Sequence, residues 1–336
     1  MNNTFPVWDD RMPFPALDTI PCPQGIGRHM VQDGRTDEIK FLHDTAVVTH
    51  QGRLLVAWYN STVAEIVGRS MIRGRWSEDG GCSWGPVFTL SEDDGQGLHH
   101  VPVDLISHQG TLYALISKMK SHDRPVSFDL HRMEADGSWH FVRQIAGSFI
   151  ANTPPLPLRD GRHIILGRAD RMPGGHPEVP AALISQSGAL DGAWRLSPFF
   201  NLDNPGLYGL QCPETTAWVE GDDITAFVRC DDGRPHSVFV SRDAGETWEG
   251  PFVNPLPMAI SKITAGNLLD GRRYIAYNAL LPGQSAWSRE HLLLCVAASE
   301  QPLLAKAFTL LRGHEDAFDR PGGWSYPSVH EANGLL

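Results

Sequence analysis

The chain has 336 residues, of which 41% are hydrophobic and 20% charged, and its formal net charge at pH 7 is −11. This is an ordinary globular composition, and a chain of this length can bury a sizeable core. The acidic balance argues against nucleic acid or an anionic membrane as a partner, but a local basic pocket could still bind an acidic sugar.

The N-terminal residues contain no basic start followed by an apolar run. Residues 1–19 read MNNTFPVWDDRMPFPALDT, which predicts neither a signal peptide nor a membrane span. The cysteines number five, and no two of them have the spacing of metal ligands. Reduced thiols in a cytoplasmic protein are therefore expected.

Short apolar strands joined by glycine turns recur along the whole chain. Each turn lies between two runs of alternating or continuous apolar residues, which is the pattern of a β-hairpin. The six turns lie at Gly52, Gly110, Gly161, Gly221, Gly271 and Gly334.

A second series of motifs lies between these hairpins. Residues 77–84 (SEDGGCSW) and 241–248 (SRDAGETW) both read S-x-D-x-G-x-[ST]-W, and weaker copies lie at 135–139 and 190–194. The Asp can bond the backbone of its own turn, the Gly permits a left-handed bend, and the Trp fills space between neighbouring sheets. The aromatic positions Trp84, Trp139, Trp194, Trp248 and Phe308 are separated by 55, 55, 54 and 60 residues.

The two interleaved series predict an all-β β-propeller of about six four-stranded blades, in a single domain over residues 1–336. A β-sandwich with a fortuitous period is the alternative. Only two residues follow Gly334, too few for a complete sixth blade. Residues 28–42, at the end of the N-terminal segment 1–42, are therefore expected to supply strands that close the last blade. The alternative is a C-terminus that has been lost.

In a propeller the innermost strand of each blade starts at the mouth of a central funnel, so the first residues of these strands share one site. Here these strands begin with hydrogen-bonding or ionisable side chains, which are costly to bury unless they are paired or used. A polar funnel is therefore a candidate site. The starts are His43–Thr45, His99–Pro102, Asn152–Pro154, Gln211–Glu214, Ser261–Thr264 and Trp324–Pro327.

The ends of the second strands add basic and amide side chains to this funnel. Basic residues from several blades indicate an anionic ligand, most simply a carboxylate, which arginine binds in bidentate geometry. Simpler roles stay open, since His43 could satisfy a backbone carbonyl and Glu214 could form a structural ion pair with Arg229. Side chains alternate along a strand, so at most one of His99 and His100 faces the funnel.

The S-x-D-x-G-x-[ST]-W motif resembles the Asp-box, or BNR repeat, of the sialidase superfamily of β-propellers. Further similarity lies in Glu214 and Arg229 around one strand pair, in the run from Asn278 to Arg289, and in Tyr326. This resemblance implies Tyr326 as a nucleophile, Glu214 as its base, Arg229 as one of three arginines on a carboxylate, and an Asp acid. Sialidases open blade one with an arginine, whereas this chain has His43 there.

Another branch of the superfamily, the rhamnosyl-glucuronate lyases and related rhamnosidases, is similar in the strands HDTAVV, HHVPV and DGRRYIAYN. It implies a terminal rhamnose linked to glucuronate as the substrate. The predicted function is therefore a carbohydrate lyase in which His43 removes a proton, and Tyr326 or His100 protonates the leaving oxygen. The residues expected to bind substrate are Arg229, Arg168, Lys262, Asn60, Gln211, Asn278 and Arg289.

Two rival functions remain. One is an exo-sialidase-like glycoside hydrolase that uses Tyr326 and Glu214, and the other is a glycan-binding propeller without catalysis. The expected partner is a small oligosaccharide with a carboxylated sugar, and neither nucleic acid nor a membrane. No cofactor is required; a Ca²⁺ ion could brace the carboxylate, although no cluster of ligands argues for one.

Overall fold

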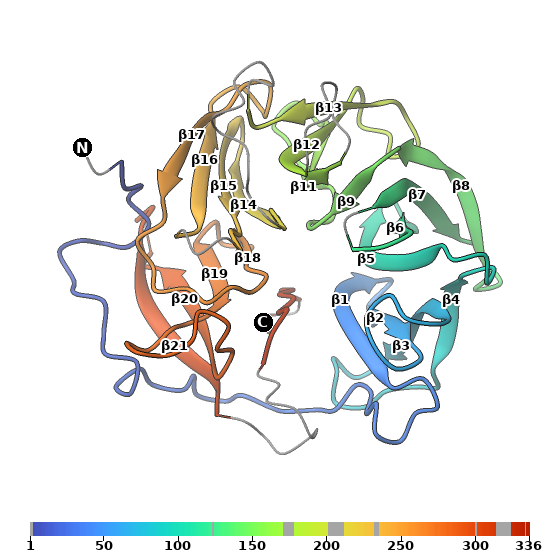
Figure 1. The fold of residues 1–336 in the computed structure, drawn as a ribbon, viewed down its shortest axis with the longest axis horizontal. Helices are drawn as coiled ribbons and strands as arrows, with labels where there is room; N and C mark the ends of the chain where they lie inside the picture. The colour runs from blue at the N-terminus through green and yellow to red at the C-terminus, as the bar shows by residue number, and fades with distance from the viewer. Residues whose placement is uncertain are drawn as a thin grey trace.

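The computed structural model describes residues 3–122, 124–170, 178–200, 212–231, 235–299, 301–313, 324–332 and 334–336. Its strands form antiparallel sheets that stand around a central axis as the blades of a propeller (Figure 1). The predicted all-β propeller is confirmed. The predicted count of about six blades is wrong, because the described residues form five sheets.

Each blade is a meander whose strands run in sequence order from the axis to the rim. Blade one holds β1 (Phe41–His50), β2 (Arg53–Ser61), β3 (Ser70–Ser77) and β4 (Phe88–Glu92). Blade two holds β5 (His99–His108), β6 (Thr111–Met119), β7 (Pro125–Met133) and β8 (Trp139–Ala146). In blade three, β9 (Phe149–Ala151) and β10 (Leu156–Pro157) both pair with β11 (His163–Ala169), followed by β12 (Val179–Ser185) and β13 (Trp194–Pro198).

The remaining two blades have the same order of strands. Blade four holds β14 (Thr215–Glu220), β15 (Asp223–Val228), β16 (Ser237–Ser241) and β17 (Glu249–Val253). Blade five holds β18 (Thr264–Asn267), β19 (Arg273–Asn278), β20 (His291–Ala297) and β21 (Leu304–Arg312). The glycine turns at 52, 110, 161, 221 and 271 each connect the first hairpin of a blade, and all five glycines have positive φ.

Both strong motifs fold into the same hydrogen-bonded turn before the outermost strand. The Asp79 carboxylate accepts from the backbone N–H of Ser83 at 2.8 Å and from the hydroxyl of Ser77 at 2.8 Å. Asp243 makes the equivalent bonds to Thr247 and Ser241, at 2.9 and 2.8 Å. The motifs therefore stabilise the turn that precedes the outermost strand in blades one and four.

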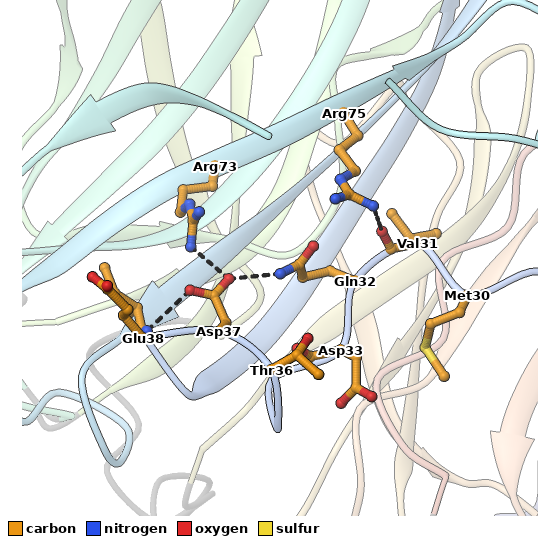
Figure 2. A pocket seen from close by; sticks show the side chains of 10 residues that line it. Met30, Val31, Gln32, Asp33, Thr36, Asp37, Glu38, Arg73 and Arg75 are labelled. Carbon is orange, nitrogen blue, oxygen red and sulfur yellow. Dashed lines mark hydrogen bonds and ion pairs between the residues drawn. The ribbon is translucent and has the colours of Figure 1, made fainter. Parts of the chain in front are cut away.

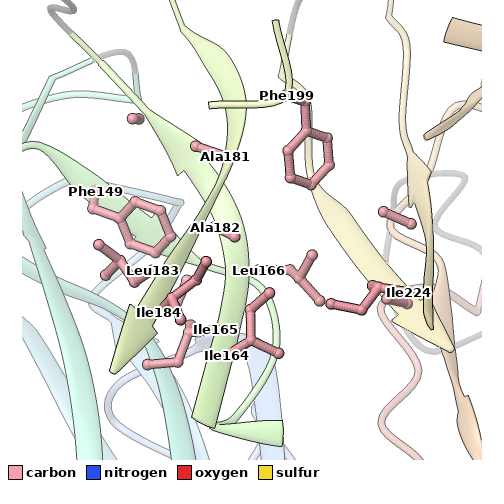
Figure 3. Close-up of a cluster of buried hydrophobic side chains, with 14 of the residues drawn as sticks. Phe149, Ile164, Ile165, Leu166, Ala181, Ala182, Leu183, Ile184, Phe199 and Ile224 are labelled. Atoms are coloured by element: carbon pink, nitrogen blue, oxygen red, sulfur yellow. The ribbon is translucent and has the colours of Figure 1, made fainter. Parts of the chain in front are cut away.

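The cores lie between blades, because neighbouring sheets pack face to face. Strands β11 and β12 are buried on both faces, which explains their unbroken apolar sequences HIILGRA and VPAALIS. Figure 3 shows the largest part of this packing, with Leu166 and Phe199 on the side that faces Ile224 of the next blade and Phe149 on the opposite side. Trp248 stacks on Phe199 with ring centroids 3.8 Å apart, so this motif tryptophan fills the space between blades three and four.

The N-terminal segment does not close a blade, contrary to the expectation for residues 28–42. Residues 3–40 form no strand; they run along the outer edges of blades four and five, where the N–H of Phe5 bonds the carbonyl of Val253 at 2.9 Å and that of Asp9 bonds Leu304 at 2.9 Å. The segment then crosses to blade one (Figure 1). There the side chains of Arg75 and Asn60 donate to the carbonyls of Val31 and Ile39, and the N–H of Lys40 bonds the carbonyl of Thr62 at 3.2 Å.

Residues 30–39 line a cavity of about 590 Å³ against β3 (Figure 2). Arg75 donates to the carbonyl of Val31 at 2.7 Å, and Arg73 pairs with Asp37 at 2.8 Å. The polar groups of this cavity are largely engaged with one another. It lies where the segment docks on blade one, and Arg73 also donates to Asn60 of β2 at 3.1 Å.

The C-terminal segment, residues 324–332, takes the sixth position around the axis, between β1 and β18 (Figure 1). His330 Nε2 accepts from the backbone N–H of Thr49 at 3.1 Å, and Ser328 bonds Thr45 at 3.1 Å. On the other side Glu331 accepts from the N–H of Leu269 at 2.6 Å. This segment therefore bridges blades one and five and brings Tyr326 to the axis.

Candidate functional site

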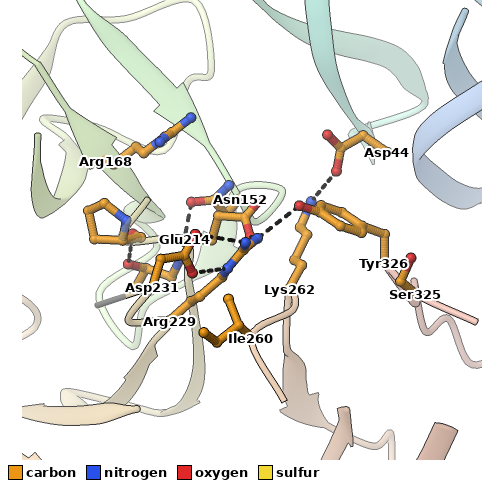
Figure 4. Close-up of polar contacts among 12 residues, drawn as sticks. Asp44, Asn152, Arg168, Glu214, Arg229, Asp231, Ile260, Lys262, Ser325 and Tyr326 are labelled. Carbon is orange, nitrogen blue, oxygen red and sulfur yellow. Dashed lines mark hydrogen bonds and ion pairs between the residues drawn. The ribbon is translucent and has the colours of Figure 1, made fainter. Parts of the chain in front are cut away.

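The axial end at which the inner strands begin gathers charged side chains from blades one, four and five and from the C-terminal segment (Figure 4). We call this group the axial cluster. It consists of His43, Asp44, Glu214, Arg229, Asp231, Lys262, Arg289 and Tyr326.

His43 and Asp44 reach the axis together because strand β1 is irregular at this point. The register of β1 against β2 shifts between His43 and Thr45, and Asp44 has a φ of 46°, a left-handed conformation that is rare for a non-glycine residue. The His43 Nδ1 atom lies 3.0 Å from Asp44 Oδ2. Adjacent residues on a regular strand would face opposite sides, so the bulge creates this pair.

The electrostatics of the pair favour a charged carboxylate beside an unusually basic imidazole. Burial lowers the pKa of His43, but the charge and hydrogen bond of Asp44 outweigh it and raise that pKa above its ordinary value. Glu65 and Glu214 act in the same direction from further away. Burial opposes ionisation of Asp44, yet Lys262 and His43 hold its pKa well below the usual range.

Tyr326 lies directly on the imidazole of His43. The two ring centroids are 4.1 Å apart, and the backbone of Tyr326 is also left-handed, with a φ of 59°. Burial, reinforced by the charge of Glu214, raises the pKa of the Tyr326 hydroxyl and keeps it protonated. A proton acceptor and a proton donor are thus in contact at the axis.

Arg229 organises the blade-four side of the axial cluster. Its guanidinium donates to Glu214 at 2.5 Å, bonds Asp231 through two nitrogens at 2.6 and 2.9 Å, and donates to the Tyr326 hydroxyl at 2.9 Å. Two carboxylates therefore neutralise Arg229 already. The ion pair between Arg229 and Glu214, which the sequence left open, is present, and Arg229 forms a second ion pair with Asp231.

Arg289 differs from the other basic residues because none of the described residues offers it a carboxylate. Its guanidinium lies 5.5 Å from the ring centroid of Tyr326, and its hydrogen bonds run to the Ile260 carbonyl at 3.2 Å and the Ser325 hydroxyl at 3.4 Å. Within the described part of the chain, the positive charge of Arg289 is therefore not compensated by a carboxylate. Trp287, two residues earlier, is 53% exposed and lies 6.0 Å from the Arg229 guanidinium.

Other residues expected at the site are engaged elsewhere. Arg168 is paired with Glu178 at 2.6 Å. His100 is bonded to Ser91 of β4 at 2.8 Å, and burial lowers its pKa to about 4, so it is a neutral group between blades one and two. Gln211 lies outside the described residues.

The two asparagines act on the backbone. The Asn60 amide donates to the carbonyls of Ile39 and Phe41 at 2.9 and 2.8 Å, which holds the N-terminal segment on blade one. Asn278 donates to the carbonyl of Trp324, two residues before Tyr326. Asn278 therefore helps to place the C-terminal segment at the axis.

The expected set gave no role to four groups that shape the site, namely Asp44, Asp231, Trp287 and Asp104, although Asp44 lies within the strand start His43–Thr45 that was expected at the funnel. Asp231 and Trp287 each stand two residues from an expected arginine, a spacing that could have indicated them. Asp104, on β5, faces the axis, where burial raises its pKa to about 6. Nothing in the sequence signals the inward turn of Asp44.

Within the described residues, no three His, Cys, Asp or Glu side chains are grouped so that they could hold a metal ion. In the same part of the chain no helix is long and apolar enough to span a membrane. The five cysteines, all within the described residues, form no disulfide with one another.

Several solved structures share the fold. The chain is similar to the Hadza microbial sialidase Hz136, at 13% identity over 82% of this chain and 60% of that one, with a TM-score of 0.65. It is similar to the NanB sialidase from Streptococcus pneumoniae, at 11% identity over 92% of this chain and 66% of that one, with a TM-score of 0.64. It is also similar to the Trypanosoma rangeli sialidase, at 13% identity over 81% of this chain and 48% of that one, with a TM-score of 0.60.

At these identities the likeness shows the fold alone. The chain spans between 48% and 66% of the length of these three sialidases. A comparison with curated proteins finds no match. The family model of the BNR repeat-like domain matches residues 52–336, which include both Asp-box turns and every residue of the axial cluster except His43 and Asp44. This chain belongs to the family of BNR repeat-like domains.

Proposed function

We propose that this protein cleaves the glycosidic bond of an acidic sugar at the axial cluster. The observation that supports the proposal is Arg289, whose positive charge has no carboxylate partner among the described residues and lies beside Tyr326. Arg289 is partly buried, and a guanidinium without a carboxylate partner can form strong charge-assisted hydrogen bonds with an anionic ligand. A sugar carboxylate on Arg289 would lie next to the contact between His43 and Tyr326.

The reaction that this arrangement supports best is β-elimination from a uronic acid. Arg289 neutralises the carboxylate and so stabilises the enolate-like charge that develops when the C5 hydrogen leaves. His43 Nε2 removes that hydrogen as a proton, and the electron pair of the C5–H bond forms the C4=C5 double bond. The C4–O bond breaks, and the leaving oxygen takes the proton of Tyr326, which is then restored from solvent.

Two properties of the site favour this division of roles. The raised pKa of His43 makes it a stronger base, and the raised pKa of Tyr326 keeps the phenol protonated as an acid. Their rings lie 4.1 Å apart, a proximity that supports removal and delivery of a proton on the same face of a sugar. Terminal rhamnose on glucuronate, the substrate that the sequence resemblance implies, has a bond of this type.

A second candidate function is hydrolysis of a sialidase-like substrate with Tyr326 as the nucleophile. Arg229 supports it, because this residue contacts both the hydroxyl of Tyr326 and the carboxylate of Glu214. The solved structures that share the fold carry the name sialidase. A nucleophilic phenol would have to lose its proton, however, and the raised pKa of Tyr326 opposes this.

Product analysis distinguishes the two reactions. The protein is incubated with oligosaccharides ending in rhamnosyl-glucuronate and, separately, with sialyl-oligosaccharides. Elimination gives an unsaturated uronate that absorbs in the ultraviolet, and the product masses sum to the mass of the substrate. Hydrolysis adds one water and no absorbance. Binding without turnover of either substrate would refute both reactions and leave a glycan-binding propeller.

The control variants define the site of the reaction. His43→Gln should abolish elimination and retain sugar binding, because Gln keeps a similar size without a basic nitrogen. His140→Gln, on the exposed surface of β8, should leave the reaction unchanged. If the His43→Gln variant catalysed β-elimination at the rate of the unaltered protein, the proposed mechanism would be contradicted.

A further inference from the structure

The Asp44 carboxylate is shared between two partners from opposite sides of the axis. Oδ2 lies 3.0 Å from His43 Nδ1, and Oδ1 accepts from Lys262 Nζ at 2.9 Å. Lys262 precedes β18 of blade five, whereas Asp44 belongs to β1, so this ion pair spans the ring (Figure 4). The side chains of Lys262 and Asp44 are only 12% and 10% exposed.

The backbone at Asp44 is arranged for this contact at a cost. An aspartate with a φ of 46° is strained, and such residues persist where the surrounding structure holds them in place. The bulge turns Asp44 toward the axis without moving His43 away from it. An unpaired carboxylate in such a buried place would be unfavourable, and Lys262 removes that difficulty.

We propose that Asp44 and Lys262 are positioning residues that set the tautomer and direction of the His43 imidazole. Asp44 is an acceptor only, so His43 Nδ1 must carry the hydrogen and Nε2 must be the bare, basic nitrogen. Lys262 fixes the position of Asp44 and keeps its charge on the carboxylate, so the proton stays on the ring. The catalytic meaning of this arrangement rests on the proposed function, whereas the tautomer and the charge coupling do not.

A structural ion pair predicts something different. If Lys262 and Asp44 only joined blades one and five, their removal would alter the stability of the ring and leave the protonation of His43 unaffected. Lys118 and Asp129 provide the comparison, since they form another ion pair with a 2.9 Å contact, on blade two, in which Asp129 is buried and Lys118 partly buried. This pair has no contact with His43 among the described residues.

The test is nuclear magnetic resonance of the full chain labelled with ¹⁵N-histidine, with His43→Gln used to assign the His43 signals. At a pH above the raised pKa of His43, where the ring is neutral, the unaltered protein should show His43 protonated on Nδ1 and bare on Nε2. A hydrogen on Nε2 instead would overturn the proposal without any variant, so the test does not depend on how the variants fold.

The variants should move the pKa of His43 in opposite directions. Asp44→Asn removes a neighbouring anion and should lower this pKa by about one pH unit or more, while Lys262→Met removes a neighbouring cation and should raise it. Lys118→Met should leave it unchanged. Equal shifts in all three variants, or no shift in Asp44→Asn and Lys262→Met, would contradict the proposal.

The titration must be interpreted with every charged neighbour in view. His43 also faces Glu65 of the β2–β3 loop, Glu214 before β14, and the ring of Tyr326, while Asp104 of β5 faces Lys262. These groups are present in all three variants and in the unaltered protein. Differences in the pKa of His43 between these proteins therefore report the effects of Asp44 and Lys262 alone.

If turnover of an acidic glycoside is found, a second readout becomes available. Asp44→Asn should lower kcat about 100-fold or more and change KM little, because a wrongly placed tautomer affects the proton transfer rather than binding. Absence of turnover in the unaltered protein would count against the proposed function, and the tautomer result would still decide this inference.

Discussion

Arg229 Nη1 lies 2.9 Å from the hydroxyl oxygen of Tyr326, a residue 97 positions further along the chain. A guanidinium can only donate, so the Tyr326 oxygen accepts this bond and its own hydrogen is free to point elsewhere. The arginine is held in turn by Glu214 and Asp231. Blade four therefore fixes the oxygen of Tyr326 and leaves its proton for a substrate atom.

This geometry predicts that Tyr326→Phe eliminates turnover without eliminating binding. Phe keeps the ring on His43 and removes the proton donor, so kcat should fall at least 100-fold while the affinity for a uronate changes little. Steady-state kinetics and calorimetry measure the two effects. Tyr113→Phe on β6 is the matched control, and equal losses in both variants would indicate a general effect of tyrosine removal.

The uncompensated charge of Arg289 predicts that Arg289→Ala weakens binding of an acidic sugar. A charged hydrogen bond contributes about 1.5–3 kcal/mol, so the Kd for glucuronate should rise roughly 10- to 100-fold. Titration calorimetry against glucuronate and against neutral glucose gives the specificity. Arg159→Ala, at a side chain that is 74% exposed, should change neither affinity. An unchanged Kd for glucuronate in Arg289→Ala would remove the main support for an acidic substrate.

Buried neutral histidines predict a loss of stability in acid. Burial lowers the pKa values of His100, His131 and His236 to about 4, while the unfolded chain keeps the ordinary value of 6.5. Between these values the unfolded state binds more protons, so the free energy of unfolding should fall as pH drops from about 6.5 to 4. Urea unfolding followed by tryptophan fluorescence at several pH values measures this slope.

A variant isolates the contribution of one of these histidines. His131→Leu should reduce the slope of unfolding free energy against pH by nearly one proton, and the full effect of one such group is of the order of 3 kcal/mol. His140→Gln should leave the slope as it is. A slope that is the same in His131→Leu as in the unaltered protein would show that His131 is not a neutral group in the fold.

The two Asp-box glycines predict unequal effects of the same substitution. Gly245 has a φ of 86°, and an added Cβ would lie 2.7 Å from Ile164 Cδ1 of the neighbouring blade. Gly81, at the same motif position, has a φ of 94° and would meet only an ordinary contact at 3.5 Å. Both alanine variants carry the left-handed strain, about 1 kcal/mol, and Gly245→Ala should lose about 1–3 kcal/mol more from overpacking. Equal losses would show that blade packing is looser than the structure indicates.

The blades could be predicted from the sequence because the turns that separate their strands are formed by local motifs. A glycine turn needs a left-handed residue and an Asp-box closes on its own side chains, so Gly52 or Asp243 can be recognised without knowledge of distant parts of the chain. The sixth turn led to a wrong blade count because a local motif identifies a turn and not a whole sheet. Gly334 does lie in a turn, between the bridged residues Ala332 and Leu335, but a turn does not determine how many strands pair beside it.

The axial cluster was only partly predictable. Counting back from each turn was enough to place His43, Glu214 and Lys262 near strand starts, because the propeller brings those starts together. Their partners depended on long-range contacts and on one irregular strand. Asp44 faces the axis only because its φ is 46°, and the alternation of side chains predicts the opposite.

The N-terminal segment has a consequence for how the chain is made. Phe5 and Asp9 bond the backbones of Val253 and Leu304, which leave the ribosome long after them. At about 5–20 residues per second, these first residues wait for roughly ten seconds to a minute before their partners are synthesised. During translation the segment therefore lacks these partners until blades four and five have been made, so it can attach to them only after most of the ring has been synthesised.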